Sequence, residues 1–366
     1  MSNQFTKLTS SYIIIIGDDM KNSKTLIVSI SSIKDIKKIT KDTKYINIDI
    51  TNPDYEIITY FLNKGKDYKY ADIINNIKGY NYVDYEIFAK AETLISLIYA
   101  NMPNDLTPLE IAKYLYVAVG KCVSFDINAD ASKNELFNLS LVTSINNLWG
   151  ALALGSVNDI TASKIYYYLC RRLDLNVSLI ANEKKKTALT KLLINNQVLV
   201  TDLFEDIPFI KVGMQTRHFA TYNDDFGMDK KIKYITNKYL DYYLDKALKD
   251  IDYTEEDCIF QLLNKIKNLI DVSNIKPLEL SVIYKYLFNT YCTNYNIKIN
   301  NLFLKNNLKK HFLLISYNDY HYSYNYKQKA YVKVIDKDLI DSLNIGKIGL
   351  YLNETIPNLT INEHLN

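Results

Sequence analysis

The spacing of apolar residues changes along the chain, and the changes define three sections. Residues 1 to about 80 carry short runs rich in β-branched residues, SYIIIIGD, TLIVSIS and YINIDIT, separated by turn-forming residues such as Gly17 and Asp18. The segment YEIITYFLN follows the third run and has helical spacing. This pattern predicts a small β-rich α/β module over residues 1–80.

Residues 81–225 show helical periodicity first and strand patterns afterwards. In YEIFAKAETLISLIYANM, apolar residues recur every three or four positions, which is typical of an amphipathic helix. A second helix is predicted at TPLEIAKYLYVAVGKC, where Thr107 and Glu110 form a capping box and Pro108 takes the first helical position. A third helix lies within GSVNDITASKIYYYLCRRLDL. Strands are predicted at NVSLIA, ALTKLLI and QVLVTDLF, with Asn195 and Asn196 as a tight hairpin turn.

The last section, residues 226–366, is predicted to be helical up to about Cys292 and to end in strands. The strand patterns are HFLLISYN, AYVKVID and KIGLYLN, and the alternating aromatic residues of HYSYNYKQKAYVKV indicate a half-exposed antiparallel strand. The sequence contains no internal repeat and no long linker rich in glycine, proline or serine. We therefore expect an α+β fold in which the three sections pack together.

Composition adds two points. The net charge is +3 over 366 residues, and the lysine-rich and tyrosine-rich stretch 230–249 is interrupted by Asp241 and Asp245, so a solvated helix face is favoured over nucleic-acid contact. The 32 tyrosines, with abundant isoleucine, asparagine and lysine, are typical of an AT-rich genome. Such a genome would belong to a low-GC bacterium or to one of its viruses.

The cysteine spacing bears on whether the protein binds a metal or cofactor, and the apolar runs bear on its cellular compartment. The four cysteines, Cys122, Cys170, Cys258 and Cys292, have no metal-ligand spacing, so we expect free thiols, no metal and no cofactor. The first residues lack the apolar segment of a signal peptide, and no run approaches the length of a membrane span. We expect a soluble protein made in the cytoplasm, with a virion or an injected effector as an open destination.

Two stretches of the middle section resemble the transglutaminase-like superfamily, which has a papain-related fold. The stretch TPLEIAKYLYVAVGKCVSFD is similar to the family's helix that precedes the nucleophile helix and ends in an aromatic–Asp pair, here Phe125 and Asp126. The stretch INNQVLVTDLFEDIPFIKVGMQTRHFAT is similar to the strands that end in the triad aspartate. The resemblance spans about Leu106 to Thr221. It implies helices packed on an antiparallel sheet.

The resemblance also implies where a catalytic triad would lie. In that family a cysteine at the helix start attacks an acyl group, a histidine accepts its proton, and an aspartate orients the histidine. Carried over to this chain, these positions fall at Asp159, near Thr187, and at Asp202. A carboxylate and a hydroxyl thus replace the thiol and the imidazole. Ser156 and Asp159 match a capping box, which favours a structural cap, and we expect Asp202 to cap the next turn or to pair with a cation such as Arg217.

Other thiols and imidazoles leave an enzymatic alternative open. Cys170 is predicted on the buried face of its helix, and His218 is the histidine nearest to it in sequence. A set of Cys170, His218 and Asp202 would need a different order and a thiol from the middle of a helix. In the last section, Cys292 and His311 echo a Cys–His order, but Cys292 falls at a helix C-terminus, where the dipole opposes a thiolate.

From these observations we expect a catalytically degenerate transglutaminase-like protein, a pseudoenzyme. It would act as a protein-binding, structural or accessory protein, related to a phage, a virion or an effector, and its partner would be a protein. The first alternative is an active cysteine hydrolase or acyltransferase that uses a non-family thiol. The second is an accessory protein that contacts nucleic acid. We expect no association with a membrane.

Overall fold

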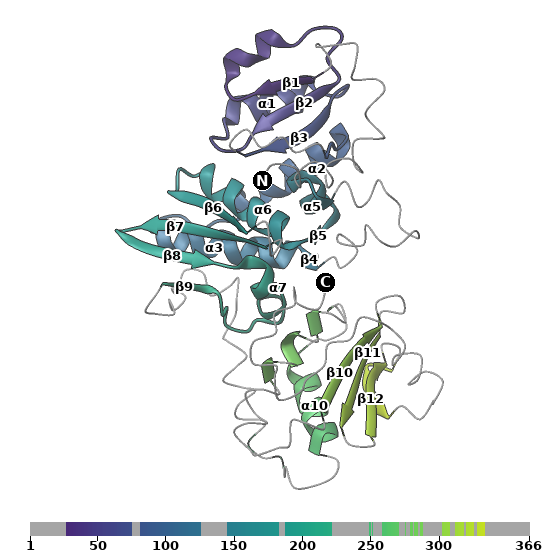
Figure 1. Ribbon diagram of the computed structural model, residues 1–366. Coiled ribbons are helices and arrows are strands. Elements are labelled where there is room, and N and C mark those ends of the chain that lie inside the picture. The colour runs from purple at the N-terminus through teal and green to yellow at the C-terminus, as the bar shows by residue number, and fades with distance from the viewer. Residues whose placement is uncertain are drawn as a thin grey trace, which may run out of the picture.

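The computed structural model describes most residues between 27 and 333 and contains both helices and strands in each of three successive parts (Figure 1). The fold is therefore α+β, as the sequence predicts. The described residues are 27–74, 81–125, 145–182, 187–221, 249, 251, 258–270, 275, 279–280, 282–284, 286–287, 302–307, 312–317, 320–325 and 328–333.

The first part is a parallel sheet of three strands in the order β1 (Ile27–Ile30), β2 (Tyr45–Asp49) and β3 (Lys69–Ile73). Parallel neighbours need crossover connections, which are supplied by the 3-10 helix η2 (Ile33–Lys38) and by helix α1 (Tyr55–Lys64). The predicted strands TLIVSIS and YINIDIT and the predicted helix YEIITYFLN are confirmed. The run SYIIIIGD lies outside the described residues.

Four helices form the centre of the second part: α2 (Tyr85–Ala100), α3 (Pro108–Cys122), α5 (Leu148–Leu154) and α6 (Asp159–Arg171). The predicted capping box of α3 is confirmed, because Glu110 accepts from the Thr107 N–H at 2.7 Å and Thr107 Oγ1 accepts from the Glu110 N–H at 3.4 Å. Helix α5 was not predicted. It is only seven residues long, too short for periodicity to identify it.

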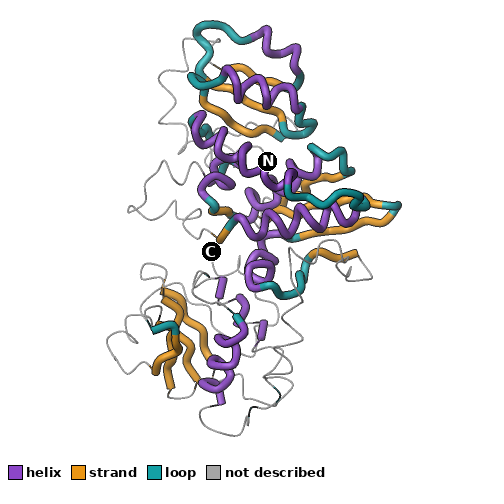
Figure 2. Tube along the Cα trace, turned by 180° about the vertical axis from the view of Figure 1, so that it is seen from behind, coloured by secondary structure: helices purple, strands orange, loops and turns teal. Residues whose placement is uncertain are grey.

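An antiparallel sheet follows in the order β6 (Val177–Asn182), β7 (Thr187–Ile194), β8 (Gln197–Thr201) and β9 (Phe219–Thr221), with helix α7 (Leu203–Val212) between β8 and β9. The predicted hairpin turn is confirmed by φ angles of 51° and 61° at Asn195 and Asn196. Helix α6 packs on β6 and β7, and α3 packs on α6 and α7. The helices thus lie on one side of the β7–β8 hairpin, as the two opposite views show (Figures 1 and 2).

The buried face of α2 includes a charged residue. Phe88 and Glu92 are buried with Ala91, Ile95 and Ile98, whereas Ile87 and Leu94 are half-buried. Glu92 accepts hydrogen bonds from Trp149 Nε1 (2.8 Å) and the Tyr168 hydroxyl (2.8 Å), and it pairs with Arg172 at 2.6 Å. A carboxylate can occupy this core position because three donors surround it, one from α5, one from α6 and one from the C-cap of α6.

The third part combines helix α10 (Cys258–Leu269) with an antiparallel sheet of β10 (Leu302–Asn307), β11 (Phe312–Tyr317), β12 (Tyr320–Asn325) and β13 (Ala330–Lys333). The predicted strands HFLLISYN and AYVKVID are confirmed, and KIGLYLN lies outside the described residues. The β12 residues Tyr322 and Tyr324 are buried, and Tyr322 stacks on Phe260 of α10 with ring centroids 5.4 Å apart. These aromatic rings therefore pack in the core of the third part.

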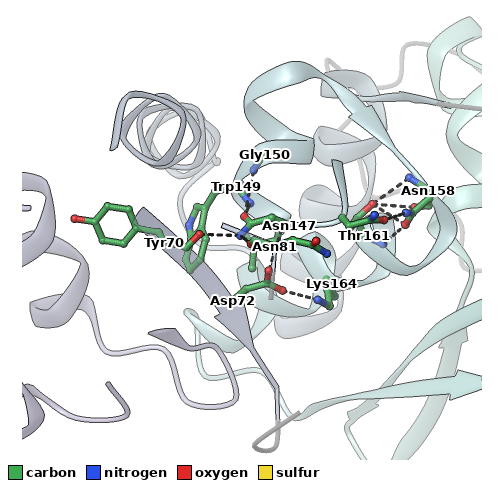
Figure 3. Close-up of polar contacts among 11 residues, drawn as sticks. Tyr70, Asp72, Asn81, Asn147, Trp149, Gly150, Asn158, Thr161 and Lys164 are labelled. Carbon is green, nitrogen blue, oxygen red and sulfur yellow. Dashed lines mark hydrogen bonds and ion pairs between the residues drawn. The ribbon is translucent and has the colours of Figure 1, made fainter. Parts of the chain in front are cut away.

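Polar bridges join the successive parts. Asn147, the N-cap of α5, donates to the carbonyls of Tyr70 (3.1 Å) and Asn81 (2.8 Å), and Lys164 of α6 pairs with Asp72 of β3 at 2.6 Å (Figure 3). On the other side, Lys211 of α7 pairs at 2.9 Å with the fully buried carboxylate of Glu279. The expectation that the sections pack together is confirmed.

Candidate functional site

The candidate site is built around the N-terminus of α6. Strand β5 (Ser156–Val157) pairs in parallel with β4 (Ser124–Phe125), and Asn158 then caps the helix. The Asn158 side chain accepts from the Thr161 N–H at 2.8 Å, and the Asn158 N–H donates to Thr161 Oγ1 at 3.0 Å (Figure 3). The predicted capping box of Ser156 and Asp159 is wrong, because Ser156 belongs to β5 and the helix begins two residues later than that box requires.

Asp159 is the first residue of α6, and its carboxylate is buried against the sheet. The residue is 5% exposed, and Oδ1 accepts a hydrogen bond from the buried N–H of Ala188 at 2.9 Å. Ala188 follows Thr187, the first residue of β7. The structure therefore brings Asp159 to the β7 backbone next to Thr187, where the residue on the α6 side of the strand is the buried Ala188.

Asp202 lies at the end of β8 and caps α7, since its side chain accepts from the Glu205 N–H at 3.2 Å. The predicted cap is confirmed. Burial, together with the negative charges of Asp159 and Glu205, raises the pKa of the Asp202 carboxyl to about 8. The influence of Asp159 on this pKa places the two carboxyl groups in one electrostatic environment.

The imidazole of His218 pairs with a different carboxylate, that of Asp206. His218 Nδ1 lies 3.2 Å from Asp206 Oδ1, while Asp206 also accepts from the backbone N–H groups of Arg217 (2.7 Å) and His218 (2.9 Å) and from the Tyr116 hydroxyl (2.8 Å). Asp206 is fully buried, whereas the His218 side chain is 45% exposed. The exposed ring is thus oriented by a fixed carboxylate.

The charge state of His218 follows from these contacts. Burial lowers its pKa, but the hydrogen bond and the charge of Asp206, together with Asp202 and Glu205, outweigh this effect and raise the pKa to about 9. An imidazole with this pKa is a cation near neutral pH and a poor general base there. The backbone carbonyl of His218 accepts a hydrogen bond from the Asp202 N–H at 3.1 Å, so the main chains of these two residues are in direct contact.

The thiols whose side chains the structure describes lie elsewhere. Cys170 is fully buried in α6, as predicted, and burial raises the pKa of its thiol far above the usual range. It comes eleven residues after Asp159, which is about 16 Å along the helix axis. Cys122 lies at the end of α3, and desolvation raises the pKa of its thiol. Cys292 and His311 lie outside the described residues.

The alternative set of Cys170, His218 and Asp202 is not assembled in this arrangement, because His218 is bound to Asp206 and Cys170 is sealed in the core. The suggested pairing of Asp202 with Arg217 is also replaced: the Arg217 guanidinium lies over the Tyr286 ring, 4.3 Å from its centroid. The stretch DLFED gave no signal that singled out Asp206, since acidic residues are common in any first helical turn.

The described ranges of the chain bear on metal binding and on membranes. Within these ranges no group of three or more His, Cys, Asp or Glu side chains could hold a metal ion, and no helix there is long and apolar enough to cross a membrane. A surface pocket of about 460 Å³ lies in the first part of the chain, between η2 and α1, and is lined by residues that include Ile33, Tyr55 and Tyr60. It does not include the residues of the candidate site.

Comparison with known proteins leaves the class open: no protein-family model matches the chain, and no curated protein is significantly similar to it in sequence.

Proposed function

We propose that this protein is a catalytically degenerate relative of the transglutaminase-like superfamily and that it binds a protein partner. The order of α3, α6, β6, β7 and β8, with helices on one side of an antiparallel sheet, supports this proposal. The three positions implied by the resemblance lie at the start of α6, the start of β7 and the end of β8. These are the places where that family would carry a thiol, an imidazole and a carboxylate.

One observation carries the proposal: the Asp159 carboxylate bonds to the Ala188 N–H. A helix N-terminus activates a thiol because its free N–H groups and its dipole stabilise negative charge. Here a carboxylate occupies that position, and it accepts a hydrogen bond from the backbone of β7. Asp202 meanwhile caps α7. We therefore infer that the Asp159 side chain stabilises the packing of α6 on the sheet.

The test is site-resolved alkylation of the native chain with iodoacetamide at neutral pH, followed by mass spectrometry of each cysteine. We expect Cys122, Cys170, Cys258 and Cys292 to react no faster than free cysteine does, since a thiol of ordinary or raised pKa is mostly protonated at this pH. A variant with serine at all four positions should keep its fold and its partner binding.

The enzymatic alternative makes the opposite forecast. One cysteine, such as Cys292, would react much faster than the others, and its replacement by serine would abolish a measurable acyl-transfer or peptidase activity. That pair of results would overturn the proposal. The Cys122→Ser variant is a matched control, because this thiol has a pKa raised by desolvation.

A further inference from the structure

The outer face of the β6–β7–β8 sheet is unusually apolar for a surface that faces away from the helices. Side chains alternate along each strand, so the inner face carries Leu192 and Leu199, which are buried in the core. The outer face carries the residues at the alternate positions, and every hydrophobic residue among them is at least partly exposed. This set, named here the outer stripe, consists of Ile180, Leu189, Lys191, Leu193, Val198 and Val200.

The strand register arranges the outer stripe in three cross-strand rows. Ile180 lies opposite Leu189 in the first row, and Leu193 lies opposite Val198 in the third. Ile180 and Leu193 are 44% and 43% exposed. Between these apolar rows, Lys191 lies opposite Val200 on β8 and opposite Ser178 on β6. Two apolar rows therefore flank one cationic centre.

We propose that the outer stripe is the docking surface for an amphipathic helix of a protein partner, with a carboxylate of that helix opposite Lys191. The inference rests on the proposed protein-binding role and gives that role a location. Exposed apolar rows gathered on one face of a folded domain mark interaction surfaces. The lysine at the centre selects the charge of the partner, because electrostatic complementarity favours an acidic group there and disfavours a basic one.

The spacing of the rows fits a helix. Leu189 and Leu193 are four residues apart on one strand, which corresponds to about 13 Å. On a helix, residues i and i+8 lie on one face about 12 Å apart, with i+4 midway between them. A helix with apolar residues at i and i+8 and a carboxylate at i+4 would match both apolar rows and Lys191.

A second copy of this chain fits the surface less well. Two outer stripes stacked on each other would bring the two Lys191 side chains toward the centre of the same interface, and like charges there are unfavourable. The inner face of the same sheet is already covered by a helix of the chain itself, α6. A partner helix on the outer face would complete a helix–sheet–helix arrangement.

The test uses a displayed library of amphipathic helical peptides about 20 residues long, roughly 30 Å, selected on the full chain. We expect the enriched peptides to carry Asp or Glu at i+4 between apolar residues at i and i+8. Lys191→Glu and Leu193→Asp should each weaken binding by about tenfold or more. A peptide with its carboxylate changed to lysine should regain affinity for the Lys191→Glu variant.

Leu97→Asp is the matched control, because Leu97 is an equally apolar side chain on α2 and is 53% exposed. It should leave peptide binding unchanged. Thermal unfolding of every variant, monitored through the single tryptophan, Trp149, verifies the fold.

Three results would overturn the inference: binding that Lys191→Glu leaves unchanged, enriched peptides without the acidic position, or self-association of the chain that Leu193→Asp abolishes. None of these touches the cysteines, so this test can fail while the alkylation result stands. The reverse also holds, since a fast-reacting cysteine would overturn the inactive site and leave the outer stripe untouched.

Discussion

Replacing Asp159 by alanine tests whether its carboxylate stabilises the fold or is kept for chemistry. The substitution removes the acceptor of the Ala188 N–H, and both residues are buried. A buried N–H left without a partner costs about 1–3 kcal/mol. Loss of a negative charge from a helix N-terminus adds about 0.3–1 kcal/mol.

One effect opposes this loss. Asp159 raises the pKa of Asp202 by charge repulsion, so its removal relieves some strain whenever both groups are ionised. The proton that Asp202 retains near neutral pH already limits that repulsion. We therefore expect Asp159→Ala to lower the free energy of unfolding by about 1–3 kcal/mol. Asp159→Asn keeps an acceptor oxygen and should cost less.

The assay is urea unfolding followed by the fluorescence of Trp149, the single tryptophan of the chain, which is fully buried in α5 beside α6. With a denaturant slope of about 1–3 kcal/mol per molar, the midpoint should fall by about 1 M. An unchanged or higher midpoint would refute the reasoning, because functional residues are often kept at a cost in stability and their removal then stabilises the fold.

Three further predictions concern other buried charges. Glu92→Ala should cost about 3–5 kcal/mol, since it leaves Arg172 buried without its partner, while the double variant Glu92→Met with Arg172→Met should cost less in the same urea assay. The contribution of His218 to stability should be fully present below the unfolded pKa of about 6.5, and it should be lost as the pH rises through about 9. His218→Gln should flatten this part of the plot of unfolding free energy against pH. A plot that this variant leaves unchanged would contradict the prediction. Lys211→Met should leave the buried Glu279 carboxylate without its cation and loosen the third part of the chain, which limited proteolysis would detect as faster cleavage, whereas an unchanged cleavage rate would argue against this attachment.

Local signals in the sequence predict much of the fold. The capping box at Thr107 and Glu110 fixes the start of α3, and the pair Asn195 and Asn196 fixes the β7–β8 turn, because both depend on residues within one turn of each other. The capping pattern at Ser156 predicts the start of α6 two residues too early, because the pairing of β5 with β4 overrides this local pattern. Nothing within α6 encodes that pairing.

The polar parts of the core could not be predicted in the same way. Glu92 and Arg172 are eighty residues apart in the chain, and a carboxylate within an amphipathic helix is ordinarily assigned to the exposed face. The sequence suggests Asp202 as the carboxylate partner of His218, whereas the fold pairs His218 with Asp206, which also binds Tyr116 of α3. The resemblance alone predicts that the start of α6 meets the start of β7, and the residue that contacts Asp159 there is Ala188, one position after Thr187.

The most direct test of the central claim rebuilds the missing groups. Asp159→Cys, alone and combined with Ala188→His, would be titrated by thiolate absorbance, with the native chain as the baseline; Ala188 is the residue next to Thr187 that lies on the α6 side of β7. If these positions are the seats of a lost thiol–imidazole pair, the introduced thiol will ionise below its usual pKa of about 8.5, and the added imidazole will lower that pKa further. An introduced thiol that titrates above the usual value, as the buried Cys170 thiol is expected to do, and ignores the imidazole would contradict the account.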